Sequence, residues 1–253
     1  MARLPKWINE AKGMLTRILL PLLLGGLALP VLAEVPKQPR APGIESGNYV
    51  WNEQTGEKVE ILKLKGDVAR GKVAYEICQG CHKPSGAGLP DGTYPQLAGQ
   101  HATVLIKQMT DIRDGSRDNP KMFPFAGKHI VSLQEIADIA AYLERLEIPR
   151  DNGKGPGTAV DQGRAIFKKE CAPCHGEQGQ GDARKFYPMV ASQHYLYMLR
   201  QMEQIRDGKR RNAHPKMVKV IKTHSEAELQ ALADYMSRLP ALARSKPAPT
   251  AGK

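Results

Sequence analysis

The stretch CQGCHKPSGAG, from Cys78 to Gly88, places two cysteines three positions apart with a histidine directly after the second. A second copy, CAPCHGEQGQG, runs from Cys171 to Gly181. The chain has 253 residues and four cysteines, and all four belong to these two motifs. A structural disulfide framework would seldom place every cysteine three positions from its neighbour and add a histidine after each pair. The two motifs therefore favour the binding of a ligand.

Both motifs belong to a longer internal repeat, because Cys171 stands 93 positions after Cys78 and many other residues match at the same shift. The register slips by two residues near the first repeat's Pro-Lys-Met and recovers at Ser132 and Ser225. Such self-similarity predicts a duplicated domain. The clearest matches pair Tyr94-Pro95 with Tyr187-Pro188, Gln100-His101 with Gln193-His194, and Ile112 to Gly115 with Ile205 to Gly208.

Each repeat has the pattern of short helices joined by long loops. Apolar residues recur at helical spacing over residues 68–77 and 102–112. A third helix is predicted after Ser132, because Glu135 three residues later completes a capping box, and Ser225 with Glu228 repeats it. No segment has a convincing strand pattern. The predicted fold class is therefore all-α.

The first 33 residues differ from the rest of the chain. Four basic residues precede the apolar run from Ile18 to Leu32, and Ala33 follows a small-residue site that suits a signal peptidase. This order predicts an exported protein that is cleaved after Ala33. The alternative is an uncleaved membrane anchor, but Pro21 and Pro30 interrupt a run that is short for a span.

Composition divides the remainder into two domains and their connections. The predicted segments are a signal peptide at 1–33, an extended arm at 34–66, a first domain at 67–146, a linker at 147–160, a second domain at 161–240 and a flexible tail at 241–253. Proline and mixed charge mark the arm, and glycine and proline mark the linker.

The chain is strongly basic, with a formal net charge of +11, and loss of residues 1–33 removes four basic groups and one acid to leave +8. An exported protein rarely meets nucleic acid, so no nucleic-acid partner is predicted. The basic residues either form a solvated surface without a partner, or they allow the protein to dock on an acidic protein face or an anionic membrane surface.

Four kinds of site compete for Cys-x-x-Cys-His. A redox dithiol lies at a helix start after a strand, and no strand precedes these motifs. A zinc site needs four ligands, whereas each repeat supplies two cysteines and one adjoining histidine. A disulfide leaves the repeated histidine without a role. Covalent haem attachment uses all three residues, because the thiols add to the haem vinyl groups and the histidine binds the iron.

The sequence therefore predicts two covalently bound haem c groups. The predicted tethers are Cys78, Cys81, Cys171 and Cys174, and the predicted iron ligands are His82 and His175.

A methionine is the predicted sixth ligand of each iron. Met122 and Met217 both follow Pro-Lys, in what the pattern indicates is a loop before the capped helix. Either could instead serve packing alone. The rivals are Met109 and Met202, which fall in a helical pattern and suit the core, His101 and His194, which suit a hydrogen-bonding role, and His129, His214 and His224, of which His214 is the strongest.

The carbonyls of Pro95 and Pro188 are predicted to accept a hydrogen bond from the ligating histidine of the same repeat. Each proline stands 13 residues after that histidine. Such a bond fixes the ring and raises its basicity. The alternative is that both prolines only turn the chain.

Taken together, these motifs resemble those of class I cytochromes c. A helix leads into Cys-x-x-Cys-His and is followed by a glycine loop, Tyr-Pro, Pro-x-Met and a closing helix. Two such units, with YPQLAGQH from Tyr94 and YPMVASQH from Tyr187, resemble the dihaem cytochrome c4 family over residues 67–240. The resemblance implies two small helical domains wrapped around their haems, with haem edges facing and His/Met ligation. The arm, which contains Trp51, is longer than the family pattern leads us to expect.

The resemblance also implies a periplasmic one-electron carrier without catalytic residues. Its expected donor is a quinol-oxidising complex or another redox protein, and its expected acceptor is a terminal oxidase or reductase. Two alternatives remain open. One is a dihaem oxidoreductase, such as a peroxidase or a thiosulfate dehydrogenase, and the other is a fixed cytochrome subunit of a membrane respiratory complex.

The haem prediction has a direct test. Mass spectrometry of the denatured protein is expected to give the polypeptide mass plus two haem groups, because thioether bonds survive denaturation. The mass of the bare polypeptide would show that the four cysteines hold no haem.

Overall fold

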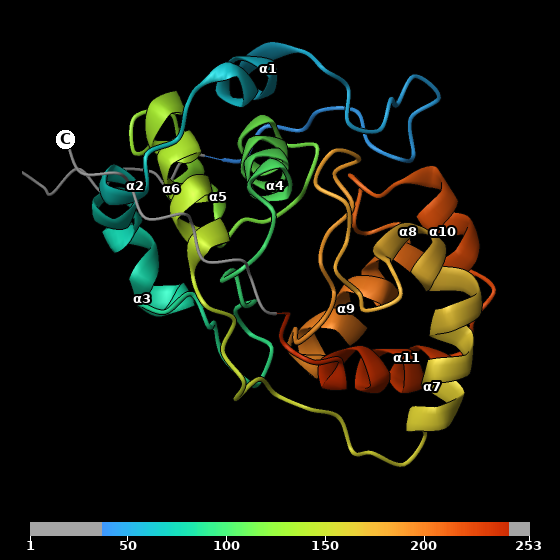
Figure 1. Cartoon of the computed structure of the whole chain (residues 1–253). Coiled ribbons are helices and arrows are strands. Elements are labelled where there is room, and N and C mark those ends of the chain that lie inside the picture. The colour runs from blue at the N-terminus through green and yellow to red at the C-terminus, as the bar shows by residue number, and fades with distance from the viewer. Residues whose placement is uncertain (1–36, 243–253) are drawn as a thin grey trace, which may run out of the picture. The chain divides into compact units, whose positions relative to one another are not determined.

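The computed structural model describes residues 37–242, and its helices follow the order of the repeat (Figure 1). The predicted signal segment at 1–33 and residues 243–253 of the predicted tail lie outside the described residues. Within residues 37–242 no helix is long and apolar enough to cross a membrane.

The fold is all-α, as predicted, and the described residues hold no strand beyond one isolated bridge between Asp182 and Tyr187. A helix α1 (Gly56–Lys63) precedes both repeats. The first repeat contains α2 (Val68–Ala74), a 3-10 turn η1 (Tyr75–Cys78), α3 (Gln79–His82), α4 (Ala102–Asp114), α5 (Phe123–Ala126) and α6 (Leu133–Arg145). The second contains α7 (Val160–Ile166), a π turn η2 (Phe167–Cys171), α8 (Ala172–His175), α9 (Tyr195–Arg206), α10 (Pro215–Ile221) and α11 (Glu226–Arg238).

Both predicted capping boxes are present. The Ser132 side chain accepts a hydrogen bond from the Glu135 amide at the start of α6, and the Glu135 side chain accepts one from the Ser132 amide in return. Ser225 and Glu228 do the same at the start of α11. These bonds satisfy amide groups that a helix start otherwise leaves unpaired.

Glycine lets the first and last helices of each repeat cross at close range. A Cβ on Gly71 of α2 would lie 2.0 Å from the carbonyl oxygen of Asp138 in α6. A Cβ on Gly163 of α7 would lie 2.0 Å from that of Ala231 in α11. The pairs α2 with α6 and α7 with α11 therefore form the frame of each repeat.

The two repeats absorb a difference of one residue just before the first cysteine. Cys78 stands seven positions after Gly71, whereas Cys171 stands eight positions after Gly163. The first repeat closes this segment with the tighter 3-10 turn, and the second with the wider π turn. As a result Tyr75 and Phe167, both fully buried, pack against Tyr142 and Tyr235 with ring centroids 5.6 and 5.4 Å apart.

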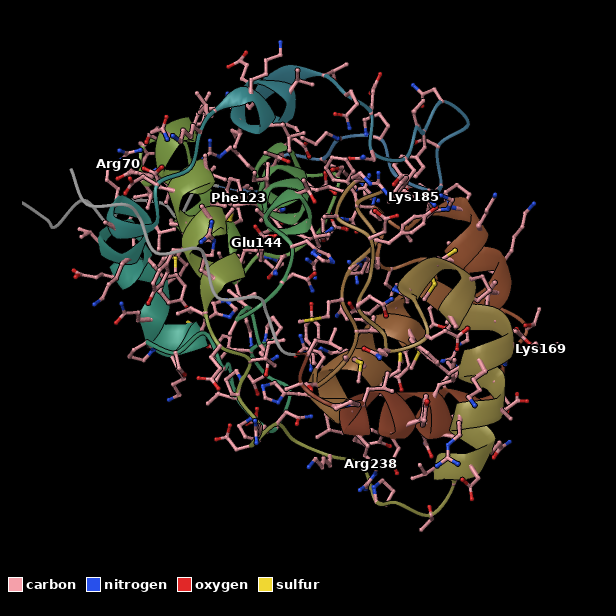
Figure 2. The ribbon with its side chains drawn as sticks, viewed as in Figure 1. Arg70, Phe123, Glu144, Lys169, Lys185 and Arg238 are labelled. Atoms are coloured by element: carbon pink, nitrogen blue, oxygen red, sulfur yellow. The ribbon has the colours of Figure 1, made fainter. Side chains whose placement is uncertain are left out.

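Each repeat also joins an arginine to a buried aspartate of its last helix, and Figure 2 labels both arginines. The guanidinium of Arg70 donates to Asp138 at 2.8 Å and 3.0 Å. The guanidinium of Arg238 donates to Asp234 at 2.7 Å and to the carbonyl of Gly155 at 2.6 Å. The first contact holds α2 on α6, and the second holds the segment before α7 on α11.

The arm predicted at 34–66 is only partly extended. Its last part forms α1, because Ile61 is fully buried in the core of the first repeat and a helix carries it there. The linker before α7 has no regular secondary structure but is packed, because the side-chain amide of Asn152 donates to the backbone carbonyls of Gln193 and Ser237 at 3.2 and 2.8 Å.

Replacement of Gly71 by alanine tests the close helix crossing. The added methyl group meets backbone rather than a flexible side chain, so Gly71→Ala is expected to lower the free energy of unfolding by about 1–3 kcal/mol. The measurement is chemical denaturation of the haem-loaded protein. Gly47→Ala is the matched control, because a Cβ there has no neighbour within 4 Å. Equal stability of the two variants would contradict the crossing.

Candidate functional site

The four cysteines lie where a helical turn leads into each histidine that is predicted to bind iron. Cys78 and Cys171 are buried, Cys81 is half-buried and Cys174 is exposed. Burial raises the pKa of the Cys78 thiol to about 11 and that of Cys171 to about 12. A reactive dithiol needs a lowered pKa, so these values do not favour the redox-dithiol alternative.

A zinc site finds no support either. The described residues contain no group of three or more histidine, cysteine or acidic side chains that could hold a metal ion. Each motif brings together two thiols and one imidazole, which is the set that covalent haem attachment uses.

Both histidine rings are buried and held at one nitrogen. The Nδ1 atom of His82 lies 3.0 Å from the carbonyl oxygen of Pro95, and that of His175 lies 2.9 Å from the carbonyl oxygen of Pro188. Burial lowers the pKa of both rings, although the carbonyl contact acts the other way. A neutral ring that donates through Nδ1 keeps Nε2 available to bind iron.

The repeated glycines bring this carbonyl to the ring. Gly88 and Gly181 have φ angles of 69° and 72°, and their amides donate to the carbonyls of His82 and His175. A Cβ on Gly88 would lie 2.4 Å from the Pro95 carbonyl oxygen. Only glycine combines this φ with so close an approach, so the loop after each histidine folds back onto the Tyr-Pro segment.

The two predicted methionine ligands lie in different local structures. Met122 is half-buried and directly precedes α5. Met217 is the third residue of α10 and packs against the core cluster that contains Cys171. The expectation that both lie in loops is therefore wrong for Met217, because Pro215 starts a helix there.

Most of the rival ligands have another contact. His101 and His194 each place Nε2 2.7 Å from a carbonyl of the other repeat, at Gln180 and Ala87. His214 accepts a hydrogen bond from the Lys216 amide, and its ring packs against Trp51 at a tilt, with centroids 4.4 Å apart. His224 contacts Glu170, His129 is exposed, and Met109 and Met202 lie in helices against the two cores.

Two arginines at matching positions were missed by the sequence analysis. Arg117 donates to the side-chain oxygens of Gln108 and Gln201 at 2.7 and 3.1 Å. Arg210 donates to the same two oxygens at 3.2 and 3.0 Å. Burial and the neighbouring Arg117 lower the pKa of Arg210 to about 10. Because the four bonds go to neutral amides, both positive charges remain available to an anionic group such as a haem carboxylate. Their shift of 93 positions was the signal that could have found them.

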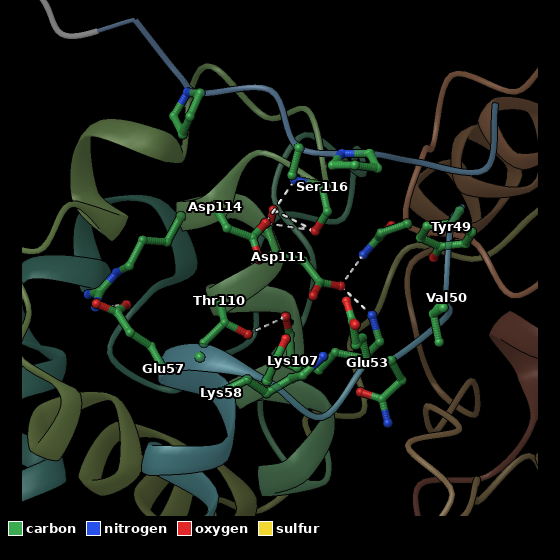
Figure 3. A pocket seen from close by; sticks show the side chains of 18 of the residues that line it. Tyr49, Val50, Glu53, Glu57, Lys58, Lys107, Thr110, Asp111, Asp114 and Ser116 are labelled. Carbon is green, nitrogen blue, oxygen red and sulfur yellow. Dashed lines mark hydrogen bonds and ion pairs between the residues drawn. The ribbon is translucent and has the colours of Figure 1, made fainter. Parts of the chain in front are cut away.

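A separate polar cavity of about 660 Å³ lies beneath the arm (Figure 3). Lys107 and Asp111 of α4 form an ion pair in its wall, and the side chain of Asn212 donates to Asp111 at 2.7 Å. None of the cysteines and histidines of the two motifs lines it. The side chain of Asn212 also donates to Gln108 at 3.2 Å, so the cavity adjoins the cluster of Arg117 and Arg210.

Comparison with known proteins finds one cytochrome family model over each repeat. The family model described as cytochrome c matches residues 68–147, and the model described as cytochrome C oxidase, cbb3-type, subunit III matches residues 158–236. A cytochrome c4 from Pseudomonas aeruginosa is 32% identical over 189 residues, which are 71% of this chain and 92% of the relative.

Two further matches agree with this one. A thiosulfate dehydrogenase electron acceptor from Stutzerimonas stutzeri is 31% identical over 198 residues, with 71% of this chain and 90% of the relative covered. The crystal structure of reduced recombinant cytochrome c4 from Pseudomonas stutzeri matches with a TM-score of 0.62 and 28% identity, over 69% of this chain and 100% of that chain. The chain therefore belongs to the dihaem cytochrome c4 family, with two cytochrome c domains that each carry a covalently bound haem c.

Proposed function

We propose that this protein is a periplasmic one-electron carrier with His/Met ligation at both irons. The proposed axial pairs are His82 with Met122 and His175 with Met217. The observation that carries the proposal is the duplicated arrangement of the histidines, each buried and held through Nδ1 by a proline carbonyl. The haem groups supply one-electron exchange at iron.

The side chains around each haem would hold it closed to substrates. The two cysteines would tether the group, and the histidine would bind the iron in an orientation that the proline carbonyl fixes. The methionine thioether would be the second protein ligand of the iron and would favour its reduced state. With no open position, a site of this kind exchanges electrons without bond chemistry.

The proposed partners are redox proteins. A quinol-oxidising complex or another dehydrogenase would act as donor, and a terminal oxidase or reductase would act as acceptor. The similarity to a thiosulfate dehydrogenase electron acceptor supports a dehydrogenase as one donor. The net charge of +8 after removal of residues 1–33 suits docking on an acidic protein face or an anionic membrane surface, and the predicted signal segment supports export.

A fixed place in a respiratory complex is the second candidate. The match of residues 158–236 to an oxidase subunit favours it over a dihaem peroxidase or dehydrogenase. Membranes washed with high salt would separate the two candidates, because a carrier is released as its electrostatic contacts are screened, whereas a built-in subunit stays.

Replacement of the methionines tests the proposed ligands. The oxidised protein is expected to show a methionine-to-iron charge-transfer band. Met122→Ala should weaken it, and the double variant with Met217→Ala should abolish it, while the histidine-ligated haems remain attached. Met109→Ala is the matched control, because Met109 lies in α4 against the first core and is not a proposed ligand. A band unchanged in the double variant would refute the ligand assignment.

A further inference from the structure

The two repeats meet through a pair of buried glutamines that are related by the 93-residue shift. Gln193 accepts a hydrogen bond from the amide of Gln96 and donates one to its carbonyl, both at 2.9 Å. Gln100 makes the same two bonds with Met189, both at 3.0 Å. Each glutamine therefore holds the backbone of the opposite repeat, and the paired donor and acceptor fix the orientation of its side-chain amide.

The peptide held in each case is the one that contacts the histidine. The carbonyl of Pro95 and the amide of Gln96 belong to one peptide unit, which contacts His82 at its oxygen and Gln193 at its nitrogen. In the other repeat, the peptide between Pro188 and Met189 contacts His175 and Gln100 in the same way. A continuous chain of hydrogen bonds thus leads from each histidine to a glutamine of the other repeat.

We propose that Gln100 and Gln193 are crossed positioning residues, each of which tunes the reduction potential of the haem in the opposite repeat. A peptide whose amide donates to an acceptor is polarised, and its carbonyl becomes a stronger acceptor. The stronger carbonyl increases the basicity of the histidine and stabilises the oxidised iron. The four hydrogen bonds of the glutamines are buried and the two histidine–proline contacts are partly buried, so contact with water weakens the glutamine bonds little.

The test is Gln193→Leu, examined by spectroelectrochemistry of the intact dihaem protein. Loss of the acceptor weakens the Pro95 carbonyl, so the potential of the first-repeat haem should shift upward while the second-repeat haem stays near its original value. Gln100→Leu should produce the reverse pattern. Gln193→Asn, which is too short to keep both bonds, replaces the leucine variant if that one does not fold.

To assign each reduction potential to its repeat, the glutamine variants are also made in a protein that carries Met122→His. Met122→His replaces the proposed methionine by a second histidine and lowers the potential of the first-repeat haem. The inference rests on the proposed axial ligands, and this background tests them separately. If Met122→His moves neither potential, the proposed ligation fails. If Met122→His does lower one potential, but the glutamine variant shifts the haem of its own repeat, only the crossed role is refuted.

The control is Thr103→Val, which removes another hydrogen bond between the repeats but leaves intact the peptide units that contact His82 and His175. The hydroxyl of Thr103 donates to the carbonyl of Ala183 at 2.7 Å. This variant should leave both potentials in place. The crossed role is wrong if Thr103→Val reproduces the effect of Gln193→Leu. It is also wrong if Gln193→Leu shifts the potential of the second-repeat haem or shifts neither potential.

A second inference concerns the arm over residues 37–52, which contacts the segment before each proposed methionine ligand. The Gln38 side chain donates to the carbonyls of Ile112 and Arg117 at 2.7 and 2.8 Å and accepts from the Asn119 amide at 2.9 Å. A Cβ on Gly115 would lie 1.8 Å from the carbonyl of Pro39, so the arm lies directly against this turn. The backbone and side-chain oxygens of Asn119 in turn accept a hydrogen bond from the amide of Met122.

The same arm holds the second repeat. The amide of Ile44 donates to the carbonyl of Arg211 at 2.8 Å, and the Arg211 side chain, which is buried, donates to Glu45 at 2.6 Å and to the carbonyl of Ala41. Trp51 packs at a tilt against the ring of His214, three residues before Met217. The arm residues that make these contacts precede both regions that match the cytochrome c family models, whereas the residues they contact lie within those regions.

We infer that the arm is a strap that holds the methionine-bearing segments of both repeats in place. The inference rests on the proposed methionine ligation. In Gln38→Ala, the segment that leads to Met122 loses its bonds at Arg117 and Asn119, so the methionine charge-transfer band should disappear at a lower guanidinium concentration than the helical circular dichroism. In the unaltered protein the two signals should be lost together. Gln54→Ala is the control, because the Gln54 side chain is exposed and, within residues 37–242, its hydrogen bond goes to the carbonyl of the nearby Asn52.

The outcomes separate the strap from the ligation it rests on. If Met122→Ala leaves the band intact, the ligand assignment fails. If that variant weakens the band but Gln38→Ala loses band and helical signal together, as Gln54→Ala does, the arm is not a strap.

Discussion

Each repeat fixes one buried imidazole through a single hydrogen bond to a proline carbonyl, and the surrounding structure is arranged around that bond. The glycine loop after the histidine folds back so that the carbonyl can reach Nδ1. The cysteines sit on the turn that presents the same ring. An iron ligand held in this way keeps one orientation and one protonated nitrogen, which an electron carrier needs in order to change oxidation state with little rearrangement.

Duplication extends this arrangement beyond a single domain. The glutamine that follows the loop of one repeat pairs with the peptide that holds the histidine of the other. The two haem environments are therefore joined through hydrogen bonds as well as through packing. The one-residue difference before Cys171 is absorbed by a π turn, which leaves the helix crossing and the aromatic pair of each repeat unchanged.

Local patterns allowed much of this to be predicted from the sequence. The motifs, the all-α class and both capping boxes depend on residues close together in the chain, and the repeat depends on residue identities alone; each is confirmed. Helix α1 was not predicted because its burial depends on the packing of Ile61 against residues that come later in the chain. The helical position of Met217, the glutamine pairs and the shared contacts of Arg117 and Arg210 were missed for a similar reason, since they depend on how distant segments meet.

With the proposed ligands, the protein itself would close both haem irons to added ligands. Cyanide added to the oxidised protein and carbon monoxide added to the reduced protein measure this closure, by absorption spectra recorded from mixing onward. Neither ligand is expected to bind rapidly at either haem, because a methionine would fill each sixth position. Rapid binding at one haem of the unaltered protein would refute methionine ligation at that haem and would favour an enzyme.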